Sequence, residues 1–174
     1  DMVSTVLLNA DFSPLGIISW KKAMKLICKK KVDVIKYSDI VIHNFELTFV
    51  SKIPLIIKLV KMIRTLWKIR VPFSKRTVII RDNFTCGYCG KRDLKGMTID
   101  HILPRSKGGK SEFENTVCCC FACNNKKDNR TPSEAKMFLK FRPYTPTIME
   151  FLIRSIKNFG MEETLNELEK LGVL

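Results

Sequence analysis

The chain has 174 residues, 45% of them hydrophobic, which suits one domain with a real core or a smaller core with helical appendages. No stretch approaches the roughly 18 apolar residues of a membrane span, and the first residues lack the basic start and cleavage site of a secretory signal. We therefore expect a soluble, cytoplasmic protein without a membrane partner.

Positive charge is abundant and unevenly placed. Lys and Arg number 31 against 17 Asp and Glu, and residues 1–141 hold 27 of the basic and 12 of the acidic residues. Such a surplus attracts polyanions, because neutralising phosphates releases counterions. The composition favours a nucleic-acid partner, with a merely soluble basic surface as the simpler alternative.

The first third of the chain predicts mixed helix and strand. Residues 6–9 read as a buried strand that ends at the turn-forming DFSP, and Ser19 can cap a helix over residues 20–30. Residues 32–37 and 40–50 are rich in β-branched and aromatic side chains and predict two strands. We expect Cys28 to be a small buried hydrophobic residue of the helix and not a metal ligand, and His43 to be structural.

Residues 58–81 contain eight basic residues and no acidic one. Lys58, Lys61, Arg64 and Lys68 have the spacing of one helix face, but residues 53–59 fit a strand equally well, so the local structure stays open. We expect this stretch to contact phosphates, with a solvated charged face as the alternative. The contacts expected in it are Arg64, Lys68, Arg70, Lys75 and Arg76.

The C-terminal part predicts three helices that are amphipathic and nearly neutral. Thr131-Pro132-Ser133-Glu134 is a capping box that predicts a helix through Leu139. Two more helices are expected over residues 148–159 and around Leu165, Leu168 and Leu171, ending near Gly172. We interpret them as packing or partner surfaces.

Seven cysteines without a secretion signal favour metal binding over disulfides. Two Cys-x-x-Cys pairs, separated by 30 residues, supply four thiolates for a structural Zn²⁺ site: Cys86, Cys89, Cys120 and Cys123. Cys118 and Cys119 compete with Cys120 for this role. We favour Cys120 because it preserves the Cys-x-x-Cys turn.

Between the cysteine pairs, residues 98–101 predict a strand, residues 104–110 a loop and residues 116–118 a returning strand, with a short helix beginning at Cys123. This order lets Asp100, His101 and Asn124 converge on one cleft, provided that the first strand ends or twists there. His101 can accept a proton from water near neutral pH, and the oxygens of Asp100 and Asn124 suit Mg²⁺. Asn115 can hydrogen-bond across the loop and fix the histidine.

These residues carry a resemblance to a known family. Asp100-His101, Pro104, Gly108-Gly109, Asn115 and Cys123-Asn124, followed by Lys127, resemble the motif of HNH endonucleases, specifically the zinc-stapled branch with Asn at the third signature position. Residues 6–24 are similar to the N-terminal extension of a bacterial and phage subgroup. Asn125 departs from the pattern, and if it is the signature residue the metal assignment shifts by one position.

The resemblance implies an α+β fold: a ββα-metal (His-Me finger) core with a structural four-Cys zinc site over residues 77–141, an N-terminal mixed α/β extension over 1–76, and C-terminal helices over 142–174. It implies hydrolysis of DNA phosphodiester bonds, with His101 as general base, Asp100 and Asn124 as ligands of one Mg²⁺ or Mn²⁺ ion, and Asn115 ordering the loop. We expect double-stranded DNA in a bacterial or phage-infected cell as substrate. Further DNA contacts expected in the core are Arg105, Lys107 and Lys127.

Two other classes compete with the nuclease. A non-catalytic zinc-ribbon nucleic-acid-binding module explains the basic residues and cysteines, but gives no reason for Asp100, His101 and Asn115 together. A protein-interaction domain explains the C-terminal helices and little else. A double-strand break needs a homodimer or two visits; the leucines of the C-terminal helices can supply a dimer surface or serve equally well as core.

Overall fold

The computed structural model describes residues 4–43, 46, 48–64 and 70–174. The chain divides into two compact units, one formed by Asp1–Arg70 with Phe159–Leu174 and the other by Val71–Asn158. Both contain helices, and both contain strands, so the chain is a mixed α+β protein. The segments expected from sequence do not coincide with these units, because the last two helices belong to different units.

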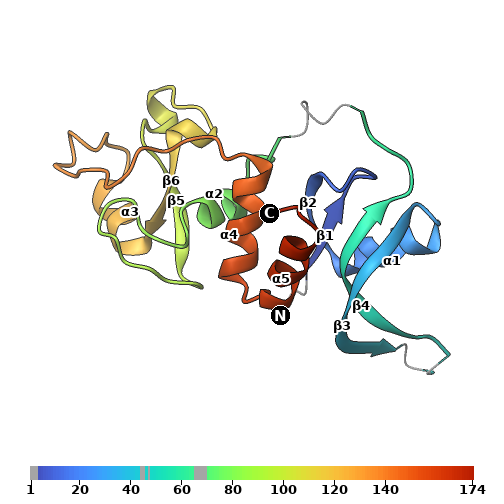
Figure 1. The fold of residues 1–174 in the computed structure, drawn as a ribbon. Coiled ribbons are helices and arrows are strands. Elements are labelled where there is room, and N and C mark those ends of the chain that lie inside the picture. The colour runs from blue at the N-terminus through green and yellow to red at the C-terminus, as the bar shows by residue number, and fades with distance from the viewer. Residues whose placement is uncertain (1–3, 44–45, 47, 65–69) are drawn as a thin grey trace. The chain divides into compact units, whose positions relative to one another are not determined.

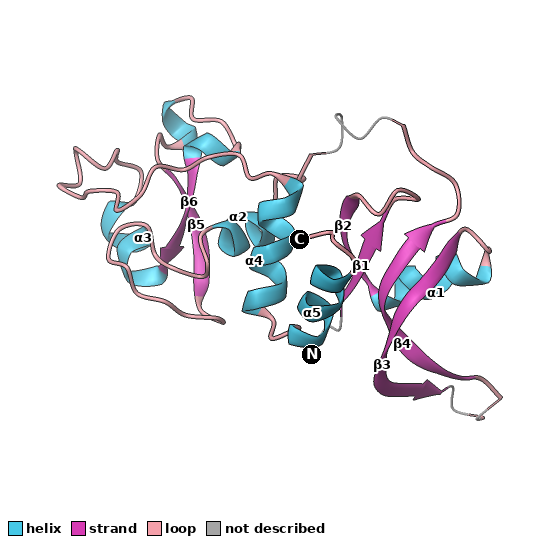
Figure 2. Ribbon diagram, in the orientation of Figure 1, coloured by secondary structure: helices cyan, strands magenta, loops and turns pink. Residues whose placement is uncertain are grey.

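The first unit contains a four-stranded sheet in the order β2-β1-β4-β3 (Figure 2). β1 (Ser4–Leu8) pairs antiparallel with β2 (Pro14–Ser19) and parallel with β4 (Val50–Leu59), and β4 pairs antiparallel with β3 (Val32–His43). The strand expected at residues 6–9 is confirmed, whereas β2 was not predicted. The expectation of two separate strands at 32–37 and 40–50 is wrong. Residues 32–43 form one strand, β3, whose pairing with β4 shifts register between Val34 and Val41.

Helix α1 (Trp20–Cys28) begins where the sequence predicts. The Ser19 hydroxyl accepts a hydrogen bond from the Lys22 N–H, and Ala23, Leu26 and Ile27 pack against the sheet. Residues 53–59 lie within β4, where Ile56 and Ile57 are fully buried. The helical alternative for this segment is therefore wrong, and Lys58, Lys61 and Arg64 do not share a helix face.

The predicted helices at the C-terminal end are confirmed in two of three cases. α4 (Ile148–Asn158) belongs to the second unit and α5 (Glu162–Lys170) to the first. The helix expected after Thr131 is wrong. Its capping hydrogen bonds between Thr131 and Glu134 are present, but Lys136 has φ +53° and the Met137 N–H bonds back to the Pro132 carbonyl, so the segment stops after one turn.

The second unit is built around a two-stranded antiparallel sheet of β5 (Met97–His101) and β6 (Thr116–Cys120). α3 (Phe121–Lys127) follows β6 directly, and Figure 1 shows it beside these strands. Two short 3-10 turns, Arg105–Lys107 and Phe113–Asn115, lie in the connection between β5 and β6. Among the described residues, no helix has the length and apolar character needed to cross a bilayer.

Arg81 fastens α2 (Lys75–Arg81) to this sheet. Its guanidinium, 1% exposed, pairs with Asp82 at 2.7 Å and donates to the backbone carbonyls of Phe113, Thr116 and Tyr144. Asp82 in turn accepts from the Cys118 N–H at 2.7 Å. Arg81 is thus a buried residue that connects α2 to the sheet. It belongs to the basic stretch 58–81 in the sequence but not to a basic surface.

Candidate active site and metal centre

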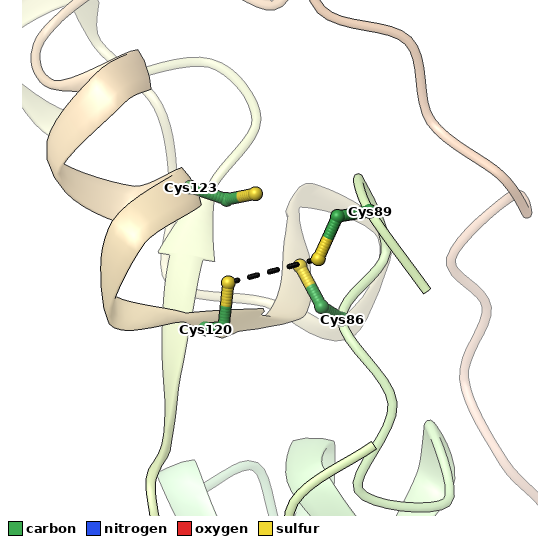
Figure 3. Close-up of side chains that lie close together, drawn as sticks. All are labelled: Cys86, Cys89, Cys120 and Cys123. Atoms are coloured by element: carbon green, nitrogen blue, oxygen red, sulfur yellow. Dashed lines mark hydrogen bonds between the residues drawn. The ribbon is translucent and has the colours of Figure 1, made fainter. Parts of the chain in front are cut away.

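The four cysteines of the two Cys-x-x-Cys pairs meet at one point. The Sγ atoms of Cys86, Cys89, Cys120 and Cys123 all lie within 4.8 Å of one another, and those of Cys89 and Cys120 are 3.7 Å apart (Figure 3). A tetrahedral zinc ion with Zn–S bonds of about 2.3 Å needs sulfurs about 3.8 Å apart. Four thiolates at this spacing fit a structural metal such as zinc.

Two elements bring these sulfurs together. Cys86 and Cys89 lie in the turn after α2, while Cys120 ends β6 and Cys123 lies in the first turn of α3. The turn packs so closely on β6 that a Cβ atom on Gly87 would lie 2.2 Å from the Val117 side chain. Glycine is required there because the two segments must touch for the metal cluster to close.

Cys118 and Cys119 stand outside the cluster and are fully buried. Burial, reinforced by the nearby Asp82 carboxylate, raises the pKa of the Cys118 thiol to about 12. The geometry therefore agrees with the choice of Cys120 as the ligand from this run of three cysteines.

An open pocket of about 270 Å³ lies on the same small sheet and helix. Its lining contains Asp100, His101 and Asn124, the three residues expected to converge. β5 ends at His101, so adjacent residues that would face opposite sides of a regular strand both reach the pocket. Its other lining residues are Ile99, Pro104, Arg105, Asn125, Asp128 and Asn129.

Asp100 is held by two donors. The Lys127 ammonium lies 3.0 Å from each carboxylate oxygen, and the Tyr88 hydroxyl donates to Oδ2 at 2.6 Å. Burial raises the pKa of Tyr88 above its ordinary range, which keeps that hydroxyl a donor. Asp100 is 7% exposed, and its Oδ1, which contacts only Lys127 among these donors, has a second lone pair with which it can accept a ligand from the pocket side.

Lys127 is not a surface residue. It is 0% exposed and also donates to the His101 carbonyl at 2.8 Å. The expectation that Lys127 contacts DNA is therefore wrong: its ammonium compensates the buried Asp100 carboxylate and ties α3 to β5. A buried cation without such a partner would be costly.

His101 is partly buried at the pocket, and its Nε2 lies 2.9 Å from the Ser111 hydroxyl oxygen. Partial burial lowers its pKa below the ordinary 6.5; Arg105 and Lys127 act in the same direction, and Asp100 opposes them. The imidazole is therefore neutral at neutral pH, which is the form that accepts a proton.

Asn115 organises the loop between β5 and β6. Its Oδ1 accepts from the Leu103 N–H at 2.9 Å, and its Nδ2 donates to the carbonyls of Leu103 and Lys110 at 3.1 and 2.8 Å. A Cβ atom on Gly109 would lie 1.8 Å from the Leu103 carbonyl oxygen, so the loop closes only with glycine there. The described hydrogen bonds of Asn115 reach the loop backbone, whereas it is Ser111 that contacts the histidine.

The expected phosphate contacts fall into three groups. Arg64, Arg70, Lys75 and Arg76 are exposed, and Arg105 lines the pocket. Lys107 is half-exposed and pairs with Glu134 at 2.6 Å. Lys68 lies outside the described residues.

Sequence reasoning missed three participants, Ser111, Tyr88 and the inward role of Lys127. Tyr88 lies inside the first Cys-x-x-Cys turn, and the Gly87 N–H ties this turn to the sheet by a hydrogen bond to the Cys118 carbonyl at 2.8 Å. No spacing rule signals these contacts, because each joins segments that are distant in sequence. A hydroxyl two residues after Gly109 was the only local signal for Ser111.

Fold and site together define a mixed α+β protein whose cysteine cluster stands beside a pocket with an imidazole, a carboxylate and amides. In comparisons with known families, residues 86–140 match the model described as HNH endonuclease, and residues 5–67 match that of the HNH endonuclease-associated N-terminal domain. A search of curated proteins found no match. The two family matches support the HNH family.

Proposed function

We propose that this protein is a metal-dependent HNH endonuclease that hydrolyses phosphodiester bonds of double-stranded DNA. The observation that carries the proposal is the shared pocket of Asp100, His101 and Asn124, next to the four-cysteine cluster. β5, β6 and α3 would then be a ββα-metal core stapled by Zn²⁺, of the bacterial and phage type. The first unit would be an accessory DNA-binding part.

His101 is the general base in this mechanism. Its imidazole is neutral near pH 7 because of partial burial and neighbouring positive charge, so it can take a proton from the attacking water. Arg105, in the same pocket, places positive charge where the phosphate oxygens gain negative charge in the transition state. Asn115 keeps the loop that carries Arg105 closed.

Asp100 and Asn124 fit a second, oxygen-bound divalent cation such as Mg²⁺ or Mn²⁺. Carboxylate and amide oxygens are the ligands such ions prefer. When bound there, the ion would polarise the scissile phosphate and stabilise the charge of the leaving oxygen. Lys127 and Tyr88 hold the Asp100 carboxylate in place for this role.

Plasmid cleavage tests the function. Wild type should cut supercoiled plasmid with Mg²⁺ or Mn²⁺ and stop when a chelator is added, and His101→Ala should lose about 10²- to 10⁴-fold in rate, the usual contribution of a general base. His43→Ala, which removes the other histidine of the chain, is the matched control and should cut normally. If wild type retards the plasmid on a gel but leaves it intact, the non-catalytic zinc-ribbon module is the correct class.

A second comparison assigns the metal-binding amide. Asn124 and Asn125 both line the pocket, and only one can be the signature residue. If Asn124 is the ligand, Asn124→Ala should raise the Mg²⁺ concentration needed for half-maximal cleavage, while Asn125→Ala should change it little. The reverse result would move the ligand to Asn125 and leave the nuclease function intact.

A further inference from the structure

Six exposed lysines lie on helix α1 of the first unit and in the turn that follows it, and we call them the lysine face. Lys21, Lys22, Lys25 and Lys29 lie on or directly after α1, and Lys30 and Lys31 continue into the turn that leads to β3. All six are exposed, and α1 contains no acidic residue. The function proposed above makes the first unit an accessory DNA-binding part, but it assigns that role to none of these lysines.

The packing of α1 fixes the direction of this face. Ala23, Leu26 and Ile27 are turned to the sheet, where they pack with Val32 and Ile57. At about 100° per residue, Lys21 and Lys25 fall on the opposite side and Lys22 on its flank, and all three are exposed. Because the apolar side of α1 is already used inside its own unit, this helix cannot insert into a lipid surface as a free amphipathic helix does.

The lysine face also lacks compensating carboxylates. Elsewhere in the same unit, Lys36 pairs with Glu163 at 3.2 Å and Lys52 with Asp39 at 3.5 Å. Within the described part of the chain, no carboxylate pairs with any of the six lysines. Their mutual repulsion favours the binding of an external polyanion.

Lys30 adds an observation on the backbone. It has φ +52°, a left-handed conformation in which glycine is favoured at a helix end. Its N–H bonds to the Ile27 carbonyl and that of Lys31 to the Leu26 carbonyl, so the turn is a regular helix stop. Glycine would be less strained at this position, so the lysine adds a positive charge to the lysine face at a cost in backbone strain.

We propose that the lysine face binds the phosphate backbone of duplex DNA without reading its sequence. This inference rests on the proposed function, which supplies the polyanion. Lys21, Lys25 and Lys29 are about 6 Å apart along the helix axis, while duplex DNA carries one charge per roughly 1.7 Å, so several phosphates lie within reach of one helix length. Ammonium groups on flexible stems act as point charges and suit phosphate oxygens more than base edges.

The test compares two double variants with equal loss of charge in the same unit. Lys25→Gln with Lys29→Gln removes two charges from the lysine face, and Lys36→Gln with Lys52→Gln removes two that are paired with carboxylates. Affinity for a short duplex is measured over a range of salt, with chelator present to prevent cleavage. The first variant should lower the slope of log affinity against log salt by about 1.8, at about 0.9 per lost phosphate contact, and the control should keep the wild-type slope.

Lys30→Gly gives an independent readout. It should raise the melting temperature, because glycine relieves the left-handed strain, and still lower the salt slope by about 0.9. A more stable protein with the wild-type slope would overturn the proposal, as would equal slopes for the two double variants. Binding to vesicles that contain anionic lipid is measured for the same variants. If the Lys25→Gln, Lys29→Gln variant loses vesicle binding but keeps DNA binding, the lysine face binds a membrane surface and the proposal is overturned.

These outcomes are separable from the cleavage test. If wild type cuts plasmid and the variants keep the wild-type salt slope, DNA binding by the lysine face is refuted and the nuclease function is retained. If the salt slopes change as expected and no cleavage occurs with any divalent ion, the nuclease function is refuted and DNA binding by the lysine face is retained.

Discussion

The Nε2 atom of His101 lies 2.9 Å from the Oγ atom of Ser111, across the loop that joins β5 to β6. Ser111 is thus the partner that fixes Nε2, and Nδ1 is the ring nitrogen left to accept a proton. A histidine acts as a base only when its other nitrogen has such a partner. Ser111 follows Lys110, whose carbonyl accepts from Asn115. The histidine, the serine and the asparagine thus depend on one closed loop.

Removing the Ser111 hydroxyl should slow catalysis with little effect on binding. We expect Ser111→Ala to lower kcat about 10-fold at unchanged KM, a part of the roughly 10²- to 10⁴-fold that a positioned general base contributes. Ser111→Thr keeps the hydroxyl and should restore most of the rate. Single-turnover and steady-state cleavage measure both constants; a KM effect alone would mean that Ser111 contacts DNA and does not orient His101.

Lys127 should be required for the stability of the second unit. Lys127→Met leaves the buried Asp100 carboxylate without its ammonium, and breaking such a pair costs about 3–5 kcal/mol. Lys126→Met, one residue earlier and exposed, is the matched control and should change the free energy of unfolding little. Urea denaturation compares the two. Equal stability of both variants would contradict the buried ion pair.

The cysteine cluster should couple metal binding to folding. Cys89→Ser removes one of four thiolates, so we expect loss of bound zinc and a large drop in melting temperature, because structural zinc contributes directly to folding. Cys28 is exposed on α1, so the expectation that it is buried is wrong, and Cys28→Ser should retain zinc and stability. Metal content by elemental analysis and thermal melts decide the matter; a zinc-free protein with a normal transition would rule out a structural site.

The loop should open when Asn115 loses its side chain. Asn115→Ala deletes three hydrogen bonds to loop backbone, each worth about 0.5–1.5 kcal/mol, and should lower both stability and kcat. Asn115→Asp keeps the acceptor for the Leu103 N–H but loses both donors, so it should fall between wild type and Asn115→Ala. Amide hydrogen exchange of residues 102–110 reports the opening directly, and unchanged protection in Asn115→Ala would contradict this role.

Local patterns predicted those elements whose residues satisfy one another within a few positions. Ser19 caps α1 because the acceptor and the amide are three residues apart, and the order of β5, loop, β6 and α3 follows from alternation, Gly108-Gly109 and the second Cys-x-x-Cys. The helix expected after Thr131 failed although its cap was correct, because Lys136 turns left-handed and ends it. Residues 53–59 became a strand because β1 and β3 pair with them on both sides.

The sequence alone determined the sulfur donor set, since four cysteines in two Cys-x-x-Cys turns define it whatever the path between them. It also determined which oxygen and nitrogen donors are available beside that set. Only the tertiary structure decided which charges are free: Lys127 and Arg81, cations in basic stretches, point inward to carboxylates, whereas the lysines of α1 remain in solvent. The reason is that the burial of a charge depends on long-range partners, which neighbouring residues do not specify.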